Sequence, residues 1–520
     1  MSLPLALPAI RTATIAPLRE AENSRVAQLG TRDKTVQSTL GQYFTPPAVA
    51  SLMAGMFGPL PKSVHLLDAG AGAGALTAAF VMNACDRSAR PHRIHATLFE
   101  LDRTQLPALE RTMVACTEFA GARGVGFSSS VVTEDFLLAA TSPLFLEELL
   151  RAGVNCAILN PPYAKLRSDS PARAALRTVG LETSNLYSAF VGVATDLMEP
   201  GGQLVAITPR SFCNGSYFLP FRRWMLERSS LDEAHIFESR DTAFAEEGVL
   251  QENVITKFTR SVKQARRVRI TASEGGSDAP SLTRDVSFSD VVHPDDHDLF
   301  FRFALQSTAQ DSAERRDRIS AKLTDLGVQV STGRVVEFRS LDLLRKTAEA
   351  GCVPLLYPHH LVGGAVVWPR EHPKKPSALL KTPESDSLLV PRGFYVLVKR
   401  LTAKEERRRL VASVLDPSKL RARFVAIENH LNFIHDEGHG LDRDLAYGLS
   451  AYLNSSDADQ AFRQFSGHTQ VNATDLRNMR FPDGRRLRRL GRRLGQPSLT
   501  QEEIDAAVAP FLESAAVRKR

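Results

Sequence analysis

The fold of this chain is decided by one stretch, Ser63-Val64-His65-Leu66-Leu67-Asp68-Ala69-Gly70-Ala71-Gly72-Ala73-Gly74, which opens into an alanine-rich run. A strand of apolar residues, a glycine turn and a helix form the first unit of a doubly wound, mostly parallel α/β sheet. The glycines let the backbone approach a ligand at the carboxyl end of the strand. Their spacing, D-x-G-x-G-x-G, differs from the dinucleotide-binding G-x-G-x-x-G. The candidate ligand-binding residues of this loop are Asp68, Ala69, Gly70, Gly72 and Gly74.

Three further strands are expected to end in polar groups at the same edge of the sheet. The strand Ile94–Phe99 ends at Glu100, a strand near Val131 is followed by Asp135 and Phe136, and a strand from Cys156 leads to Asn160. An acid at the end of the second strand usually holds a ribose hydroxyl pair in this architecture, although an exposed acid is the plain alternative. A carboxylate followed by an aromatic ring fits one edge and one face of an adenine.

The fourth of these strand ends runs into Asn160-Pro161-Pro162-Tyr163. Two prolines cannot continue a sheet ladder because each lacks the N–H and has a fixed φ, so the chain leaves the sheet as a stiff turn. The turn offers an amide, the carbonyl of Pro161 and an aromatic ring. Two acceptors beside a ring suit a planar base that carries an exocyclic amine. A structural turn with a buried tyrosine is the alternative.

Composition divides the chain into five parts. Residues 1–30 lack clear periodicity and are expected to be a loosely held arm, and Thr45 before Pro46-Pro47 is a good helix start. The first globular region is expected at 31–262, a linker or helical connection at 263–325, a region of short strands and turns at 326–484, and a basic tail at 485–520.

The net charge, the cysteines and the hydrophobic pattern indicate which class of protein to expect. The net charge of +7 and the pI of about 9.2 have the sign expected for a polyanionic partner. Five scattered cysteines without metal-ligand spacing indicate reduced thiols. We find no apolar run of membrane-spanning length and no signal-peptide pattern, and we therefore expect a soluble protein of the cytoplasm. No metal site is expected, because His435-Asp436-Glu437-Gly438-His439 lacks the helical H-E-x-x-H spacing.

Taken in order, these motifs resemble those of the gamma class of N6-adenine DNA methyltransferases, in which the cofactor motifs precede the N-P-P-Y motif. Residues 331–339, 429–432 and 466–472 resemble the target-recognition half of methylases of the PstI/BsuBI type, from type II restriction–modification systems. The resemblance implies a Rossmann-like methyltransferase domain over 31–262 that uses S-adenosyl-methionine. A mixed α+β DNA target-recognition domain would follow over 326–484.

The resemblance also implies a role for each site residue. Thr45 and the loop 68–74 would hold the methionine end of S-adenosyl-methionine, Glu100 the ribose, and Asp135 with Phe136 the adenine. Catalysis would use Asn160, Pro161, Pro162 and Tyr163. The Asn160 side chain and the Pro161 carbonyl would accept both hydrogens of adenine N6. Tyr163 and Phe244 would stack on the base flipped out of double-stranded DNA, and a core aromatic is the alternative for Phe244.

The implied function is protection of host DNA in a bacterial cytoplasm, close to the nucleoid, with any cognate restriction endonuclease encoded as a separate polypeptide. Two alternatives stay open. N-P-P-Y also suits the amide of a protein glutamine or an RNA adenine, and a binding module that has kept the fold would show the same pattern. The arginine pairs between Arg485 and Arg493 are consistent with phosphate contacts or with a solvated helix face.

Overall fold

The computed structural model divides into two compact units, Met1–Leu305 and Gln306–Arg520, which we describe separately. The structure describes residues 16–29, 44–143, 147, 153–237, 253–273, 282–294, 296–303, 318–402, 406–465, 470–495 and 500–512.

The first unit is built on a nine-stranded sheet in the order β3-β2-β1-β4-β5-β7-β6-β8-β9. Strands β1 to β5 pair in parallel, and β7 runs antiparallel between β5 and β6. This is the doubly wound, mostly parallel sheet that the sequence predicts, and that prediction is confirmed. The strands are β1 (Ser63–Ala69), β2 (Arg93–Phe99), β3 (Gly126–Val132), β4 (Val154–Leu159), β5 (Met198–Pro209), β6 (Ser229–Phe237), β7 (Asn253–Arg260), β8 (Arg267–Ser273) and β9 (Leu282–Ser287).

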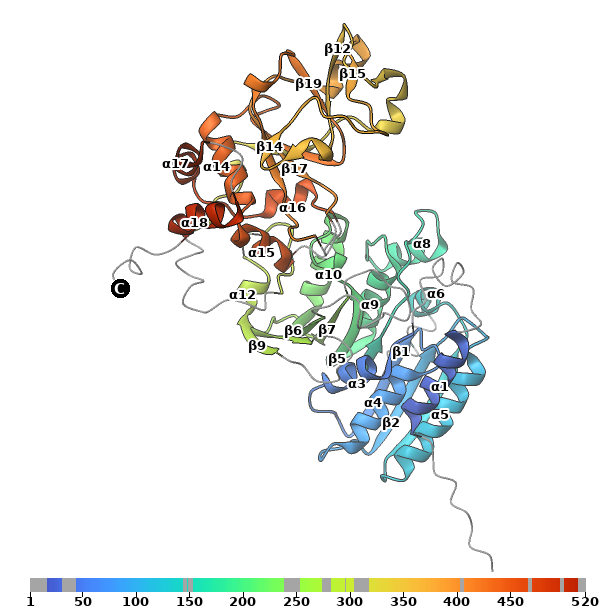
Figure 1. Ribbon diagram of the computed structural model, residues 1–520. Coiled ribbons are helices and arrows are strands. Elements are labelled where there is room, and N and C mark those ends of the chain that lie inside the picture. The colour runs from blue at the N-terminus through green and yellow to red at the C-terminus, as the bar shows by residue number, and fades with distance from the viewer. Residues whose placement is uncertain are drawn as a thin grey trace, which may run out of the picture. The chain divides into compact units, whose positions relative to one another are not determined.

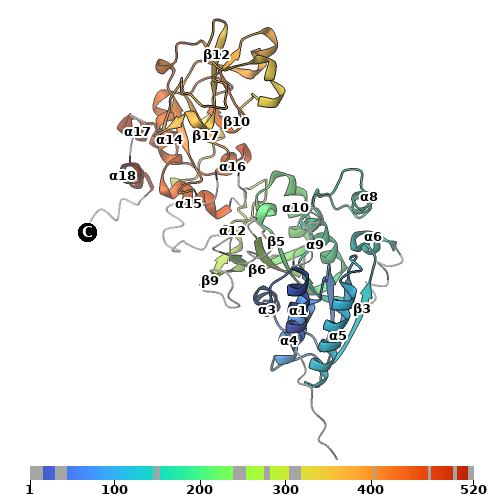
Figure 2. The ribbon, with the colours of Figure 1, turned by 45° about the vertical axis from the view of Figure 1, so that its right-hand side comes forward.

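Helices cover both faces of this sheet (Figure 1, Figure 2). Successive strand residues point to opposite faces, so Leu66 packs with one set of helices and Leu67 with the other. The first set is α1 (Pro17–Leu29), α3 (Pro47–Gly55), α4 (Ala75–Asp86) and α5 (Leu106–Gly121). The second set is α6 (Phe136–Thr141), α8 (Pro171–Thr178), α9 (Leu186–Leu197) and α10 (Leu219–Arg228). Because helices cover both faces of the central strands, the strand ends are the natural place for a ligand.

The sheet extends beyond residue 262, where the sequence analysis ends the first globular region. Strand β8 pairs in parallel with β6, and β9 pairs with β8, followed by the short helix α12 (Phe288–Val291). The alternating side chains of Val268, Ile270 and Ala272 are buried and add to the core of the first unit. Strands β8 and β9, which lie inside the stretch expected to be a connection, are therefore part of the sheet.

The N-terminal segment also differs from the expectation of a loose arm. Residues Pro17–Leu29 form α1, which packs against α4 and α5. Ala21 is buried, and Arg111 of α5 bonds to α1 through Glu20 (Nε to Oε1, 2.9 Å) and Ser24 (Nη2 to Oγ, 3.3 Å). Polar contacts thus contribute to the packing of this helix, and hydrophobic periodicity does not reveal them.

The second unit is mixed α+β, as expected. It contains a six-stranded sheet in the order β10-β20-β17-β18-β14-β13 and a five-stranded sheet in the order β11-β15-β12-β19-β16. Its strands are β10 (Gln329–Thr332), β11 (Leu344–Arg345), β12 (Cys352–Leu356), β13 (Leu361–Val362), β14 (Ala365–Val366), β15 (Ala378–Leu380), β16 (Leu389–Pro391), β17 (Tyr395–Lys399), β18 (Ala412–Leu415), β19 (Phe424–Ile427) and β20 (Leu431–His435). Its helices are α14 (Arg443–Leu453), α15 (Ser456–Phe465), α16 (Ala473–Asn478), α17 (Gly484–Leu494) and α18 (Gln501–Leu512).

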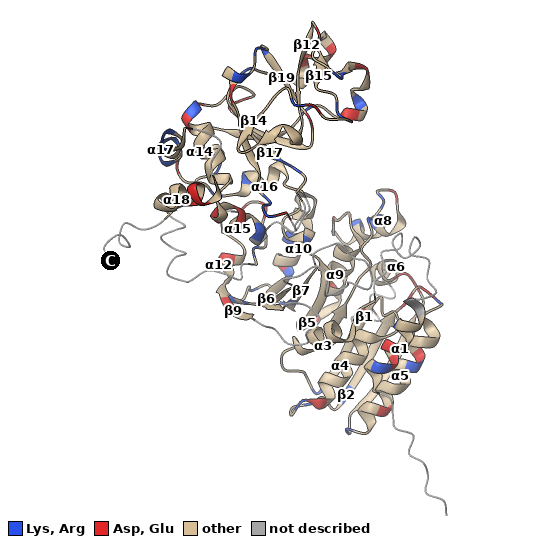
Figure 3. Ribbon diagram, in the orientation of Figure 1, with Lys and Arg blue, Asp and Glu red and all other residues tan. Residues whose placement is uncertain are grey.

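The arginine pairs of the expected basic tail lie on a packed helix, α17 (Figure 3). Leu487 and Leu490, which separate the pairs, are buried against the unit, so the arginines form the outer face. Two of them pair with acids that cap or begin α14: Arg488 with Asp442 (Nε to Oδ1, 3.3 Å) and Arg492 with Asp444 (Nε to Oδ2, 3.2 Å). The pairing with α14 explains why this segment is part of the unit rather than a tail.

Helices α14 and α17 cross at two glycines. A Cβ at Gly448 would overlap the Leu487 carbonyl oxygen, and a Cβ at Gly491 would overlap the Asp444 carbonyl oxygen. The two backbones are therefore too close for any side chain at the crossing.

We predict that Gly491→Ala forces the two helices apart and destabilises the protein by about 3 kcal/mol or more. Urea unfolding of the full chain measures this loss. The matched control is Gly121→Ala, at a helix glycine whose Cβ would meet open space and which should cost little. Equal unfolding midpoints for the two variants would contradict the close packing.

Candidate functional site

The carboxyl ends of the parallel strands meet at one edge of the first sheet. Ala69 of β1 lies beside Phe99 of β2, which lies beside Val132 of β3, and β4 flanks β1 on its other side. The strand order reverses between β1 and β4, and open α/β sheets bind ligands at such a point. The ends of these strands are therefore neighbours at one edge of the sheet.

The glycine loop after β1 has a backbone that only glycine adopts without strain. Gly70, Gly72 and Gly74 have φ values of +85°, +54° and +85°, and Gly74 caps the start of α4. Glu100 fixes the loop from the end of β2: its Oε2 accepts the Gly72 N–H at 2.7 Å, and its Oε1 accepts the Asp102 N–H at 2.7 Å. The loop and the acid thus form one rigid element.

Asp68 is a fully buried carboxylate behind this loop. Its Oδ2 accepts the Thr77 hydroxyl at 2.7 Å, and its Oδ1 has no hydrogen-bond partner among the described residues. Burial raises the pKa of Asp68 to about 7, and the nearby negative charge of Glu100 adds to the rise, against the Thr77 hydrogen bond. Ala69, which follows, is fully buried at the end of β1.

Asn160 follows β4 and is bonded to a segment far away in the sequence. Its Nδ2 donates to Thr45 Oγ1 at 2.9 Å. Thr45 does not cap a helix as expected, because α3 begins at Pro47 and Pro46 holds the capping position without a side-chain bond. The buried Thr45 hydroxyl instead fixes the amide group, and with it the direction of the acceptor Oδ1.

The rest of the N-P-P-Y turn is also held in place. Pro161 is buried and Pro162 is half-buried. Tyr163 is half-buried, donates its hydroxyl to the Ile207 carbonyl at 3.4 Å, and lies edge-to-face with Tyr187 at 6.3 Å between ring centroids. The ring is therefore anchored at its polar tip beside the end of β5.

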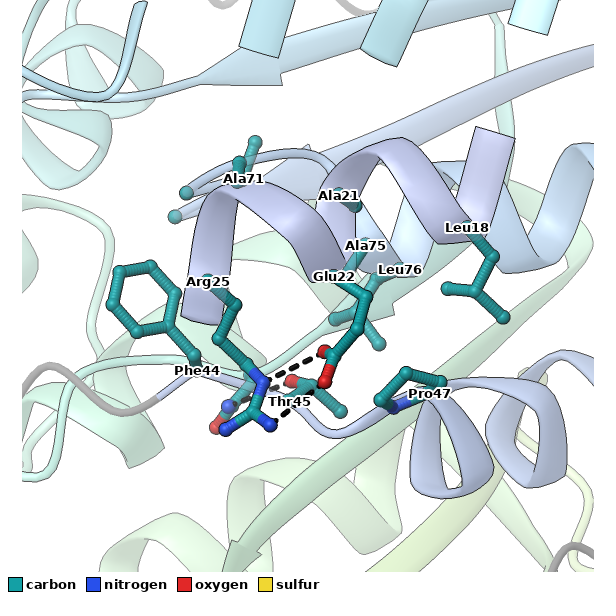
Figure 4. Close-up of a pocket in the computed structure, with 14 residues that line it drawn as sticks. Leu18, Ala21, Glu22, Arg25, Phe44, Thr45, Pro47, Ala71, Ala75 and Leu76 are labelled. Atoms are coloured by element: carbon teal, nitrogen blue, oxygen red, sulfur yellow. Dashed lines mark hydrogen bonds and ion pairs between the residues drawn. The ribbon is translucent and has the colours of Figure 1, made fainter. Parts of the chain in front are cut away.

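An open pocket lies between the glycine loop, Asn160 and α1 (Figure 4). Its lining residues are Leu18, Ala21, Glu22, Arg25, Phe44, Thr45, Pro47, Gly70, Ala71, Gly72, Ala73, Ala75, Leu76 and Asn160. Four site residues expected from the sequence are among them: Thr45, Gly70, Gly72 and Asn160.

Sequence reasoning missed the contribution of α1 to this pocket. Leu18, Ala21, Glu22 and Arg25 follow one another at the i, i+3, i+4 and i+7 spacing of a single helix face. That spacing, with Pro17 at the helix start, is the signal from which the helix could have been found.

Asp135 and Phe136, expected to bind an adenine, do not line the pocket. Asp135 caps α6, with its Oδ1 accepting the N–H of Leu137 at 2.9 Å and of Leu138 at 3.1 Å. Phe136 is buried in the core beside Phe99, with 5.0 Å between their ring centroids. Their contact with a ligand stays a prediction. Phe244 lies outside the residues that the structure describes.

Asn432 and Arg334 of the second unit belong to residue types that can bind DNA bases, but both form hydrogen bonds within the protein. Asn432 is buried, donates to the Val471 carbonyl at 2.6 Å and accepts the Thr332 hydroxyl at 3.1 Å. Arg334 donates to the carbonyl oxygen of Leu389 at 3.0 Å. These two residues therefore shape the unit.

Metal clusters and membrane-spanning helices are both absent from the described ranges. Among these residues, no group of three or more His, Cys, Asp or Glu side chains is arranged to hold a metal ion. None of the described helices has the length and apolar character needed to cross a membrane.

We predict that Asp68 makes the stability of the ligand-free protein depend on pH. Because its folded pKa is raised to about 7, the folded state holds a proton that the unfolded chain releases near its ordinary value of 3.8. Stability should therefore fall as the pH rises between these values, by at most about 1.4 kcal/mol per pH unit.

Asp68→Asn should remove this fall, so that its stability relative to the original chain grows from pH 5 to pH 7 and then levels off. Urea unfolding across pH 5 to 8.5 measures the difference. Asp169→Asn, which removes an exposed carboxylate, is the control. Parallel pH profiles for Asp68→Asn and the original chain would contradict the assignment.

Comparisons with known proteins identify the family. The family model described as Eco57I restriction-modification methylase matches residues 133–244. Among solved structures, that of the type IIL restriction-modification enzyme MmeI in complex with DNA is similar over 97% of this chain and 74% of that chain. Its TM-score is 0.54 and its identity is 12%, a likeness that supports the fold alone.

Two curated relatives are similar over nearly the whole chain. The type II methyltransferase M.PstI of Providencia stuartii is 40% identical over 98% of this chain and 98% of that protein. The type II methyltransferase M.BsuBI of Bacillus subtilis is 40% identical over 92% of this chain and 94% of that protein. The family expected from the motifs is confirmed: this chain belongs to the PstI/BsuBI family of type II restriction–modification methyltransferases.

Proposed function

We propose that this chain is a site-specific DNA methyltransferase that transfers a methyl group from S-adenosyl-methionine to N6 of an adenine in double-stranded DNA. The observation that carries the proposal is that Asn160, fixed by Thr45, and the glycine loop line one pocket. A methyl donor held by the loop would thus lie next to the acceptors of the N-P-P-Y turn.

The residues present fit S-adenosyl-methionine. The glycine loop leaves backbone room for the ligand, and the free Oδ1 of Asp68 is a buried acceptor behind it. Glu100 lies at the end of β2, where this architecture holds ribose hydroxyls. When bound, the cofactor supplies an electrophilic methyl group on a sulfonium, a chemistry that requires no metal. Asp135 and Phe136 remain our candidates for the far, adenine end of this ligand.

The N-P-P-Y turn would activate the amine. Adenine N6 is a poor nucleophile because its lone pair is delocalised into the ring. If Asn160 Oδ1 and the Pro161 carbonyl accept both N6 hydrogens, the nitrogen is held closer to a pyramidal state with its lone pair directed at the methyl. The same acceptors stabilise the positive charge that develops on N6. Pro162 keeps the turn stiff, and alignment supplies further acceleration.

The base must leave the duplex, because N6 of a stacked adenine does not reach such a site. The anchored ring of Tyr163 would stack on the flipped base, and Phe244 is our candidate for its opposite face. The second unit, which carries the arginine-rich helix α17 (Figure 3), would bind the duplex and recognise its sequence. Methylation would protect the DNA of a bacterial host in its cytoplasm from a separately encoded endonuclease.

Expression in a bacterial host without DNA methylases, followed by sequencing that reports N6-methyladenine, tests this function. We predict that one sequence motif becomes fully modified. Asn160→Ala should lower modification at least about 100-fold, because it removes an acceptor aimed at the developing charge. Asn155→Ala is the control, since this amide bonds to β1 at the opposite end of the same strand.

Full modification with Asn160→Ala, or loss of modification with both variants alike, would contradict the role of Asn160. Unmodified DNA in cells that hold folded protein would contradict the DNA substrate. That outcome would favour an RNA adenine or a protein glutamine, whose amide also suits the N-P-P-Y turn.

A further inference from the structure

An ion pair between Glu22 and Arg25 lines the pocket and has no role in the methyl transfer described above. On α1, Arg25 Nε lies 2.7 Å from Glu22 Oε2, and Arg25 Nη2 lies 2.8 Å from Glu22 Oε1. Arg25 is only 6% exposed. Figure 4 shows both charged groups beside Thr45, on the side of α1 that faces the pocket.

These two side chains give the pocket its ionisable groups. Among the described residues that line it, only Glu22 and Arg25 carry a charge at neutral pH. The remaining lining is glycine, alanine and other apolar residues, with the neutral side chains of Thr45 and Asn160. The pocket therefore presents one anion and one cation, side by side, in surroundings that are otherwise poor in charge.

Stability of α1 is a weak reason for this arrangement. Removing an ion pair from water carries a desolvation penalty, which its Coulomb attraction often fails to offset. Other contacts already hold α1 in place: Pro17 and Ala21 are buried, and Arg111 of α5 donates to Glu20 and Ser24. A ligand that carries both charges would add a counter-charge for each member of the pair.

We propose that Glu22 and Arg25 bind the zwitterionic amino-acid end of the cofactor, a proposal that rests on the function given above. Arg25 donates Nε and one N–H of Nη2 to Glu22, and the guanidinium gives the α-carboxylate a further charge-assisted hydrogen bond. The Glu22 carboxylate accepts hydrogen bonds from the α-ammonium. The net charge of the pair matches that of the amino-acid end, so the ligand is bound without an unpaired charge.

Helix α1 thereby becomes part of the cofactor site, together with the glycine loop. Backbone N–H groups at the start of α4, next to Gly74, are the rival partner for the carboxylate. The two arrangements predict different roles for Arg25. If the backbone N–H groups bind the carboxylate, the affinity for S-adenosyl-methionine does not depend on the charge of Arg25.

Calorimetric titration of the full chain, without DNA, separates them with three probes. These are S-adenosyl-methionine, decarboxylated S-adenosyl-methionine, which lacks the carboxylate, and 5′-methylthioadenosine, which lacks the whole amino-acid end. We expect Arg25→Met to raise the Kd of S-adenosyl-methionine about 10- to 100-fold, because charge-assisted hydrogen bonds are lost. The same variant should leave the Kd of the other two probes within about 3-fold of the original.

Glu22→Gln gives a different pattern. Glu22→Gln should raise the Kd of S-adenosyl-methionine and of its decarboxylated form alike, because both keep the ammonium. It should leave the Kd of 5′-methylthioadenosine unchanged. Arg19→Met is the matched control, an exposed arginine of the same helix outside the pocket, and should change no Kd. Thermal unfolding of each variant checks that the fold is kept.

Three results would overturn the proposal. If Arg25→Met leaves the Kd of S-adenosyl-methionine unchanged, the carboxylate binds elsewhere. If Arg25→Met raises the Kd of all three probes equally, Arg25 only holds α1 in place. If the original chain binds none of the probes, the proposed function fails together with this inference, and that result is distinct from the first two.

Discussion

The hydrogen bond from Asn160 to Thr45 joins the two halves of the site. Asn160 ends the fourth strand, whereas Thr45 precedes the helix α3, and 115 residues separate them in the sequence. An amide on a free turn would sample several orientations. With its Nδ2 held at 2.9 Å by a buried hydroxyl, the amide directs its oxygen in one direction, which an acceptor in catalysis requires.

The surrounding structure supports this bond from both sides. The prolines after Asn160 stiffen the turn, and the loop of Gly70 lies against it, with the Asn160 carbonyl oxygen 3.9 Å from where a Cβ on Gly70 would lie. Glu100 holds the loop through Gly72. Helix α1 closes the opposite side with the Glu22–Arg25 pair. The pocket is therefore built from segments that are separate in sequence: the pairing of β1 with β4 brings the loop of Gly70 and Asn160 together, and the packing of α1 on α4 and α5 adds the helix.

The sheet and most of its edge were predictable, because strand composition, glycine turns and proline pairs act locally. The Thr45–Asn160 bond was not, since no local pattern reports a contact between two loops. Helix α1 was not predicted from the sequence, because Glu22 and Arg25 occupy positions at which a packed helix face usually has hydrophobic residues. That Asp135 caps α6 and that the Phe136 ring packs beside Phe99 was also not foreseen, because both contacts depend on where α6 begins. Strands β8 and β9 follow a polar stretch, which suggested a boundary where the sheet continues.

The most direct test of this account is the single-turnover rate of methyl transfer to duplex DNA in Thr45→Val and Thr45→Ser. Thr45→Val keeps the shape and loses the hydroxyl, so the rate should fall about 10- to 100-fold. Thr45→Ser keeps the hydroxyl and should stay within about 3-fold of the original. The affinity for S-adenosyl-methionine should change less than the rate in both variants. An unchanged rate in Thr45→Val would contradict the claim that this hydrogen bond positions Asn160 for catalysis.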